Sequence, residues 1–214
     1  GGGGANSADG NAGGGKGGSG IVIIRYPVGT VKAGVTAGDP YWSKVVLLAG
    51  NDNKADATTA FADQSKSPHT LTTVGDAQYD TAQAPTGLTS SLLLDGTGDY
   101  LESLDSDDWD FPGSVTVETW VRWNVVGNTM FVTHADSATT WYWFKEGNVM
   151  YIQTPSSSGG WTPVANTWYA IAVEWNGTNT SLYVDGSRIA QSATNAFNDT
   201  DTAKLRIGIR GDNV

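Results

Sequence analysis

The chain has 214 residues, with 12 basic and 22 acidic side chains, 28 glycines and no cysteine. A formal charge of −10 without Lys/Arg clusters argues against a nucleic-acid surface, and the absence of cysteine excludes disulfides, thiolate metal sites and cysteine nucleophiles. The longest apolar runs are too short to span a bilayer, so we expect no membrane insertion. Asp outnumbers Glu by 18 to 4, and no apolar spacing of helical period is sustained. Because Asp, Ser and Thr favour turns over helix surfaces, the sequence predicts an all-β chain.

The first 20 residues contain 11 glycines mixed with small and polar residues. This composition favours a flexible linker, and a packed sleeve of hydrogen-bonded polyglycine segments is the alternative. The run Gly10–Lys16 has the spacing of a phosphate-binding loop, but Gly17 stands where that motif needs Ser or Thr. We therefore assign no phosphate site to this glycine-rich segment, residues 1–20.

Residues 21–38 are predicted to form a short strand and a linker. Ile21–Tyr26 is rich in β-branched residues and is ended by Pro27. Asp39-Pro40 marks a turn, and residues 39–214 are predicted to form the main domain. Strand-like runs separated by turn residues recur through this domain: Lys44–Ala49, Ser91–Leu94, Ser114–Trp123, Thr129–His134, Thr140–Lys145, Val149–Gln153, Trp168–Trp175, Ser181–Val184 and Lys204–Arg210.

The longest of these runs alternate between apolar and polar side chains with the period of a half-buried strand. Tight hairpins are predicted at Asn176-Gly177 and at Asp185-Gly186. Closely spaced antiparallel strands of this kind indicate a two-sheet sandwich or jelly roll. The residues expected to share one face are Val115, Val117, Thr119, Val121 and Trp123 on the first strand, and Tyr169, Ile171, Val173 and Trp175 on the second.

Several stretches resemble the laminin G-like, concanavalin A-like jelly-roll family. They are, in chain order, Asp39–Leu48, Phe61–Ser65, Leu94–Leu101, Val115–Arg122, Asn166–Tyr169 and Leu182–Gly186. The resemblance implies an antiparallel jelly roll over residues 39–214. Members of this family continue past the strand that resembles Leu205–Gly208 to a further acidic strand, so we expect that the chain is longer or that a partner chain supplies that strand.

A second resemblance concerns the N-terminal segment. The run Gly17–Tyr26, at the end of the glycine-rich stretch, is similar to glycine-rich segments of phage tail-fibre and related virion proteins. Together, the two resemblances imply a virion protein in which the glycine-rich segment leads into a jelly roll.

The same fold includes glycoside hydrolases, which need two carboxylates flanking the scissile bond. The hydrolases that the chain resembles carry a Glu-x-Asp-x-x-Glu strand, and the equivalent strand here keeps Glu118 but has Thr116 and Trp120 beside it. Glu174 could approach Glu118 only if the two strands pair suitably. We expect no enzymatic activity, with a remnant glycosidase as the weaker hypothesis.

The sequence contains few residues suited to a metal site or to histidine catalysis. The two histidines, His69 and His134, exclude a multi-histidine metal site, and His134 is predicted to lie at the surface at a strand end. The run Asp105–Asp110 lacks the spacing of an EF-hand and is predicted to be a solvated turn. The family resemblance instead implies a structural calcium ion held by Asp52 and Asp63.

Nine tryptophans provide most of the candidate ligand-binding surface. Trp141 and Trp143 lie on one face of a predicted strand, and Tyr142 and Phe144 lie on the other. One set is therefore expected to be buried, and the other to stack on sugars or on a neighbouring subunit. The candidate ligand-binding residues are Trp141, Trp143 and Trp161. For Trp141 and Trp143, core or interface packing is the favoured interpretation and ligand binding the alternative, whereas for Trp161 the two are equally favoured.

These observations lead to one functional hypothesis and one alternative. The sequence is interpreted as a non-enzymatic phage structural protein, a tail fibre, appendage or capsid decoration, that assembles as a homotrimer with other virion proteins and attaches to cell-surface glycans through many weak contacts. The alternative is a carbohydrate-binding or adhesion module of a secreted or cell-surface bacterial protein. Apart from calcium, no cofactor is expected.

Overall fold

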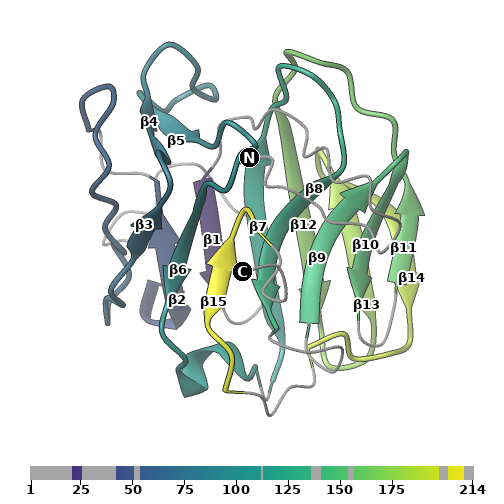
Figure 1. The fold of residues 1–214 in the computed structure, drawn as a ribbon. Helices are drawn as coiled ribbons and strands as arrows, with labels where there is room; N and C mark the ends of the chain where they lie inside the picture. The colour runs from purple at the N-terminus through teal and green to yellow at the C-terminus, as the bar shows by residue number, and fades with distance from the viewer. Residues whose placement is uncertain are drawn as a thin grey trace.

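The computed structural model is an antiparallel β-sandwich (Figure 1). It describes residues 21–25, 42–50, 54–111, 113–135, 141–153, 157–197 and 202–209. For residues 21–25, only the backbone is described. Within these ranges, the only helices are two 3-10 turns, η1 (Trp42–Lys44) and η2 (Asp107–Trp109), and none is long and apolar enough to cross a membrane.

Two large sheets face each other, and every strand pair within them is antiparallel, which confirms the predicted all-β sandwich. The six-stranded sheet has the order β14 (Ser187–Ser192), β13 (Thr180–Val184), β12 (Tyr169–Trp175), β7 (Val115–Val121), β1 (Ile21–Arg25) and β2 (Val45–Ala49). The seven-stranded sheet has the order β11 (Ser157–Gly160), β10 (Val149–Gln153), β9 (Trp141–Glu146), β8 (Thr129–His134), β15 (Leu205–Ile207), β6 (Tyr100–Ser103) and β3 (Thr72–Val74). A small third sheet pairs β4 (Gln78–Asp80) with β5 (Ser91–Leu93).

Strand β1 is an internal strand of the six-stranded sheet. It pairs on one side with β2 and on the other with β7, where Ile23 lies opposite Glu118 (Figure 1). The sequence interpretation assigned this strand to a separate segment, residues 21–38, ahead of a domain starting at residue 39. The sandwich includes this strand, because β1 lies between β7 and β2 in the six-stranded sheet and pairs with both.

The hydrophobic core lies between the two large sheets. Val117 on β7 and Val173 on β12 pair directly and are fully buried, as the predicted alternation requires. Lys145 on β9 also points into this core, with its Nζ 3.0 Å from the Gly127 carbonyl oxygen and 5.8 Å from the ring centroid of Trp123. Burial lowers the pKa of Lys145 below its ordinary value, because the charged ammonium is deprived of water.

Two tight turns set the register of the C-terminal half of the six-stranded sheet. Asp185 and Gly186 both have positive φ, 49° and 77°, as a two-residue type I′ hairpin needs. The side chain of Asn176 accepts hydrogen bonds from the backbone N–H groups of Thr178 and Asn179 and so closes the other turn. Both predicted hairpins are present.

The two sheets approach closely along one side of the sandwich. Gly159 on the edge strand β11 lies so near to β14 that a Cβ atom there would come within 2.9 Å of the Ile189 carbonyl oxygen. Gly160, the next residue, has open space around it. Glycine at position 159 therefore allows the edges of the two sheets to pack together.

Candidate functional site

Trp141 and Trp143 do not form a surface site. Their exposed fractions are 1% and 0%, and their rings pack into the core against Phe111, Phe197 and Phe131. A buried ring cannot stack on a ligand, so these two candidates are corrected to core residues. Core packing, which was part of the interpretation favoured for them from the sequence, is what the structure shows.

The opposite face of β9 carries the aromatic side chains that point away from the core. The Phe144 ring stacks on Tyr142 at 5.4 Å, and on Tyr151 of β10 at 4.8 Å with an interplanar angle of 12°. Tyr151 lies directly opposite Phe144 in the register, and Met130 of β8 lies opposite Phe144 on its other side. We call Tyr142, Phe144 and Tyr151 the aromatic row; Phe144 and Tyr151 are half-buried and Tyr142 is buried.

Charged groups continue the same face of the sheet beyond the aromatic row. Tyr142 lies opposite Thr133, and Thr133 lies opposite Arg206 of β15, which in turn lies opposite Glu102 of β6. Glu102 pairs with Lys204 at 2.7 Å and with Arg206 Nε at 3.5 Å. Two cations thus meet one carboxylate here, in a chain whose overall charge is −10. Stacked rings beside polar groups form a surface that suits the apolar face and the hydroxyls of a sugar.

Trp161, the third aromatic candidate, lies at one end of the sandwich. Its ring is half-buried, with edge contacts to Trp123 at 5.4 Å and to Tyr169 at 5.2 Å. The Trp161 ring therefore packs against the core, although its place in a predicted loop favoured an exposed ring. Beside it, the loops after β7 and before β12 are joined by a backbone hydrogen bond from Asn166 N–H to the Trp123 carbonyl and by one from Arg122 to the Asn166 side chain.

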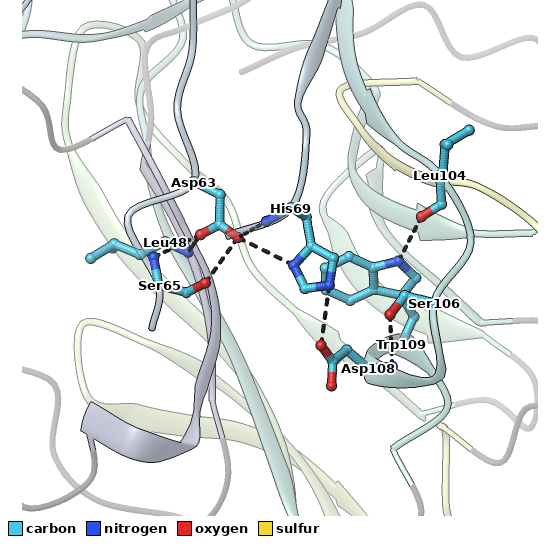
Figure 2. Close-up of polar contacts among 8 residues, drawn as sticks. All are labelled: Leu48, Asp63, Ser65, His69, Leu104, Ser106, Asp108 and Trp109. Carbon is cyan, nitrogen blue, oxygen red and sulfur yellow. Dashed lines mark hydrogen bonds and ion pairs between the residues drawn. The ribbon is translucent and has the colours of Figure 1, made fainter. Parts of the chain in front are cut away.

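Asp63, the predicted calcium ligand, has its carboxylate fully engaged by the protein itself (Figure 2). Its Oδ1 accepts the backbone N–H groups of Leu48 and Ser65, both at 2.9 Å. Its Oδ2 accepts the Ser65 hydroxyl at 2.9 Å and the His69 backbone N–H at 2.8 Å. Because calcium needs carboxylate oxygens free to coordinate it, Asp63 does not fit that role. Asp52 lies outside the described residues.

The ring of His69 joins the Asp63 loop to η2 (Figure 2). Its Nδ1 lies 3.2 Å from Asp63 Oδ2, and its Nε2 lies 3.1 Å from Asp108 Oδ2. The ring also packs on Trp109, with the centroids 4.5 Å apart. The acidic run at residues 105–110 is thus a capped turn that anchors this loop, with Ser106 accepting the Asp108 N–H.

His134 differs from its prediction. The sequence placed it at the surface, but the side chain is fully buried, with its ring 6.1 Å from Trp141 and its Nε2 3.4 Å from Asp105 Oδ1. The burial arises because His134 lies directly opposite Trp141 in the register of β8 and β9 and so shares its core-facing side. That contact is tertiary and leaves no signal in the local sequence.

Three carboxylates that the sequence analysis did not single out converge near β6. Asp76, Asp95 and Asp99 each have an oxygen within 4.8 Å of the others. Asp99 is only 2% exposed and accepts the backbone N–H groups of Asp76 and Asp95. Burial raises the pKa of Asp99 from 3.8 to about 6, with the neighbouring carboxylates acting in the same direction and the backbone hydrogen bonds opposing them.

The two candidate carboxylates of the hydrolase hypothesis lie on the same outer face of the six-stranded sheet. Strands β7 and β12 pair so that Glu118 is opposite Ala172 and Glu174 is opposite Thr116, which makes the two glutamates diagonal neighbours. Glu174 accepts a hydrogen bond from the Tyr183 hydroxyl at 2.8 Å. The strands therefore pair as that hypothesis required, although proximity alone assigns no reaction to them.

Comparisons with known proteins agree with this architecture. A family model for the concanavalin A-like lectin/glucanases superfamily matches residues 95–213, more than half of the chain. No curated protein sequence matches. Among solved structures, the receptor-binding domain of the botulinum neurotoxin C/D mosaic serotype superposes with a TM-score of 0.57 at 14% identity, covering 79% of this chain and 44% of that one.

Two further neurotoxin structures are similar at the same level. The binding domain of botulinum neurotoxin DC in complex with rat synaptotagmin II gives a TM-score of 0.54 at 10% identity, covering 76% of this chain and 43% of that one. A structure described by the words "cell entry of botulinum neurotoxin type C is dependent upon interaction with two ganglioside molecules" gives a TM-score of 0.54 at 12% identity, covering 76% of this chain and 42% of that one. The chain spans less than half the length of these proteins, so the likeness concerns the fold alone.

Proposed function

Because the chain belongs to the concanavalin A-like lectin/glucanases superfamily, we propose that it is a non-enzymatic virion structural protein that displays its jelly roll for assembly and for attachment to glycans on a host surface. The observation that carries the binding role is the pair of half-buried, stacked rings of the aromatic row, Phe144 and Tyr151, on the outer face of the seven-stranded sheet. The buried Tyr142 ring packs against Phe144 and supports the pair. Outer faces of antiparallel sheets are normally polar, so stacked rings there call for a partner.

The chemistry of this face favours a saccharide. Aromatic rings stack on the apolar faces of sugar rings, while the neighbouring Glu102, Lys204 and Arg206 offer donors and acceptors to hydroxyls. The neurotoxin domains of similar fold include one described as dependent on two gangliosides for cell entry, which supports a glycan as the class of partner. Repeated display on a particle would turn weak single contacts into useful avidity.

The virion setting and the trimer rest on the glycine-rich segment, residues 1–20, which lies outside the described residues. A carbohydrate-binding module of a secreted or cell-surface bacterial protein is the alternative. Light scattering separates the two: a trimer that becomes a monomer when residues 1–20 are removed, with β1 retained, supports the fibre. A monomer with and without these residues supports the secreted module.

The glycan role is tested by binding to an immobilised panel of bacterial and animal glycans. Phe144→Ala and Tyr151→Ala are expected to weaken binding by about tenfold each, because each removes one stacking ring. Tyr151→Phe keeps the ring and is expected to bind as the unaltered chain does. Val125→Ala, at an exposed position away from the row, is the control. Binding that is equal in all variants, or absent in the unaltered chain, would refute the proposal.

The absence of catalysis is tested separately. Hydrolysis of a polysaccharide that disappears in Glu118→Gln would contradict the non-enzymatic assignment. The proposal includes no calcium ion, because the Asp63 carboxylate is already saturated by hydrogen bonds.

A further inference from the structure

Strand β1 completes the six-stranded sheet by lying between β2 and β7 (Figure 1). Ile24 of β1 lies opposite Leu47 of β2 on one side and opposite Val117 of β7 on the other, and both of these partners are fully buried in the core. Without β1, β2 and β7 would each leave a row of backbone N–H and C=O groups unpaired in the middle of the sheet. We call the position between β2 and β7 the β1 slot; it accepts one extended apolar strand.

The connection between β1 and β2 is much longer than their pairing requires. Arg25 lies directly opposite Val45, and antiparallel neighbours of this kind need only about 2–5 connecting residues. Elsewhere in the sandwich, residues 147–148 join β9 to β10, and residues 185–186 join β13 to β14. Between β1 and β2, residues 26–44 intervene, a length that can reach up to about 60 Å, whereas a domain of this size has a radius of gyration of about 15 Å. The length of this connection therefore does not require β1 to pair within its own sandwich.

A β1 strand supplied by another copy would make the same contacts as the copy's own strand. The slot is formed by β2 and β7, so the register of its hydrogen bonds does not depend on which chain supplies β1. The free-energy difference between the two arrangements is then confined to the connection. A tether of this length keeps β1 at an effective concentration of about millimolar near its own slot, and copies held together in one assembly reach similar local concentrations.

The position of β1 in the sequence brings it close to other copies in the proposed assembly. The glycine-rich segment ends at residue 20, and β1 begins at Ile21, so no residue separates the two. Strand β2, which forms one side of the slot, is separated from β1 by residues 26–44. Association of the glycine-rich segments would therefore gather the β1 strands of several copies, and would place each strand within reach of its neighbours' slots.

We propose that β1 is exchanged between copies of this chain, so that the β1 strand of one copy fills the slot between β2 and β7 of a second copy. The partner is thus a second copy of this chain, and the interface is the backbone ladder on both sides of β1. Because each copy gives one strand and receives one, the exchange closes a ring of copies. The number of copies rests on the trimer proposed above, whereas the exchange does not depend on glycan binding.

Engineered disulfides test the exchange, because the chain contains no cysteine of its own. Directly opposed residues on antiparallel strands have Cα atoms about 4.5–5.5 Å apart, which a disulfide can bridge. Ile23 and Glu118 are such a pair, so the full chain carrying both Ile23→Cys and Glu118→Cys is purified under reducing conditions and then oxidised. On a denaturing gel without reductant, we expect the main product to be two or three linked chains, joined between positions 23 and 118 as identified by peptide mass spectrometry.

A second pair makes the test independent of any one substitution. Ile21→Cys with Trp120→Cys follows the same register and is expected to give the same linked product. Ile23→Cys with Ser158→Cys is the matched control, because Ser158 is exposed on β11 in the other sheet. The control should give few linked chains, and linkage equal to that of the register pairs would show random thiol coupling and overturn the proposal.

Two other outcomes would also overturn the exchange. One is a main product of single chains with an internal disulfide in both register pairs, and the other is no disulfide in either pair. The result is separable from the function proposed above. A trimer in light scattering whose register pairs form only internal disulfides would overturn the exchange and leave the trimer in place. Linked chains that bind none of the panel glycans would refute the glycan role and support the exchange.

Discussion

Asp99 makes the stability of the protein depend on pH in a direction that can be worked out from the structure. Its pKa is about 6 in the folded state and 3.8 without the fold, so between these values the folded protein binds more protons than the unfolded chain does. The stability that this group contributes is therefore complete below about pH 3.8 and is lost as the pH rises through 6. A shift of about 2 units corresponds to about 3 kcal/mol. That is a large part of the 5–15 kcal/mol typical of a domain.

The prediction is tested by urea unfolding, followed by tryptophan fluorescence, at pH values from 4 to 7. Asp99→Asn removes the titration and resembles the neutral acid in shape. We expect the free energy of unfolding of the unaltered chain to fall by about 2–2.5 kcal/mol relative to the variant between pH 4 and pH 7, because a small part of the effect is already lost at pH 4. The comparison with the variant cancels the titration of all other groups that the two proteins share.

Asp107→Asn is the control, because Asp107 is an exposed carboxylate on η2. It should follow the pH dependence of the unaltered chain. A free-energy difference between the unaltered chain and Asp99→Asn that stays constant from pH 4 to pH 7 would refute the reasoning, since it would mean that Asp99 has the same proton affinity in the folded and unfolded states.

Three further substitutions test the packing. Lys145→Met removes a buried ammonium and is expected to raise the free energy of unfolding at pH 7 by about 1–2 kcal/mol. This gain should shrink as the pH approaches 10.5, because a group with a lowered pKa makes the unaltered protein more stable as the pH rises. Unfolding at pH 7 and pH 10 checks both statements, and an equal gain at the two values would contradict them. Gly159→Ala forces a contact with β14 and should cost about 1–3 kcal/mol, whereas Gly160→Ala, with open space around it, should cost less than 1, as judged by thermal unfolding. Trp141→Ala leaves a core cavity and should cost about 3–5 kcal/mol in urea unfolding, while a loss under 1 would place the ring outside the core.

Local patterns in the sequence were sufficient for the long strands and their turns. The alternation in Val115–Val121 and Tyr169–Trp175, and the turn at Asp185-Gly186, all correspond to the observed elements. Strand β11, by contrast, consists of Ser-Ser-Gly-Gly and reads as a loop. It becomes a strand because it pairs with β10 and because Gly159 permits close contact with the other sheet, and neither cause is local.

Prediction of the candidate site from the sequence was limited in the same way, because its residues depend on contacts that are not local. The sequence showed that Trp141–Glu146 has aromatic side chains on both faces, but only the second sheet decides which face is buried. Asp63 likewise matched a family pattern, and nothing in its neighbourhood indicated that four hydrogen bonds from Leu48, Ser65 and His69 would engage its oxygens. Both corrections concern contacts between segments that are distant along the chain.

The internal position of β1 has a consequence for how the protein is made. Ile23 pairs with Glu118, about 95 positions later, so the centre of the six-stranded sheet is a contact of high sequence separation. At a synthesis rate of about 5–20 residues per second, the β-branched strand Ile21–Arg25 leaves the ribosome roughly 5–20 seconds before β7 exists to pair with it. During that interval, the strand is open to association with other nascent chains. Expression at lower temperature, or with a chaperone that holds extended apolar segments, should therefore increase the soluble yield.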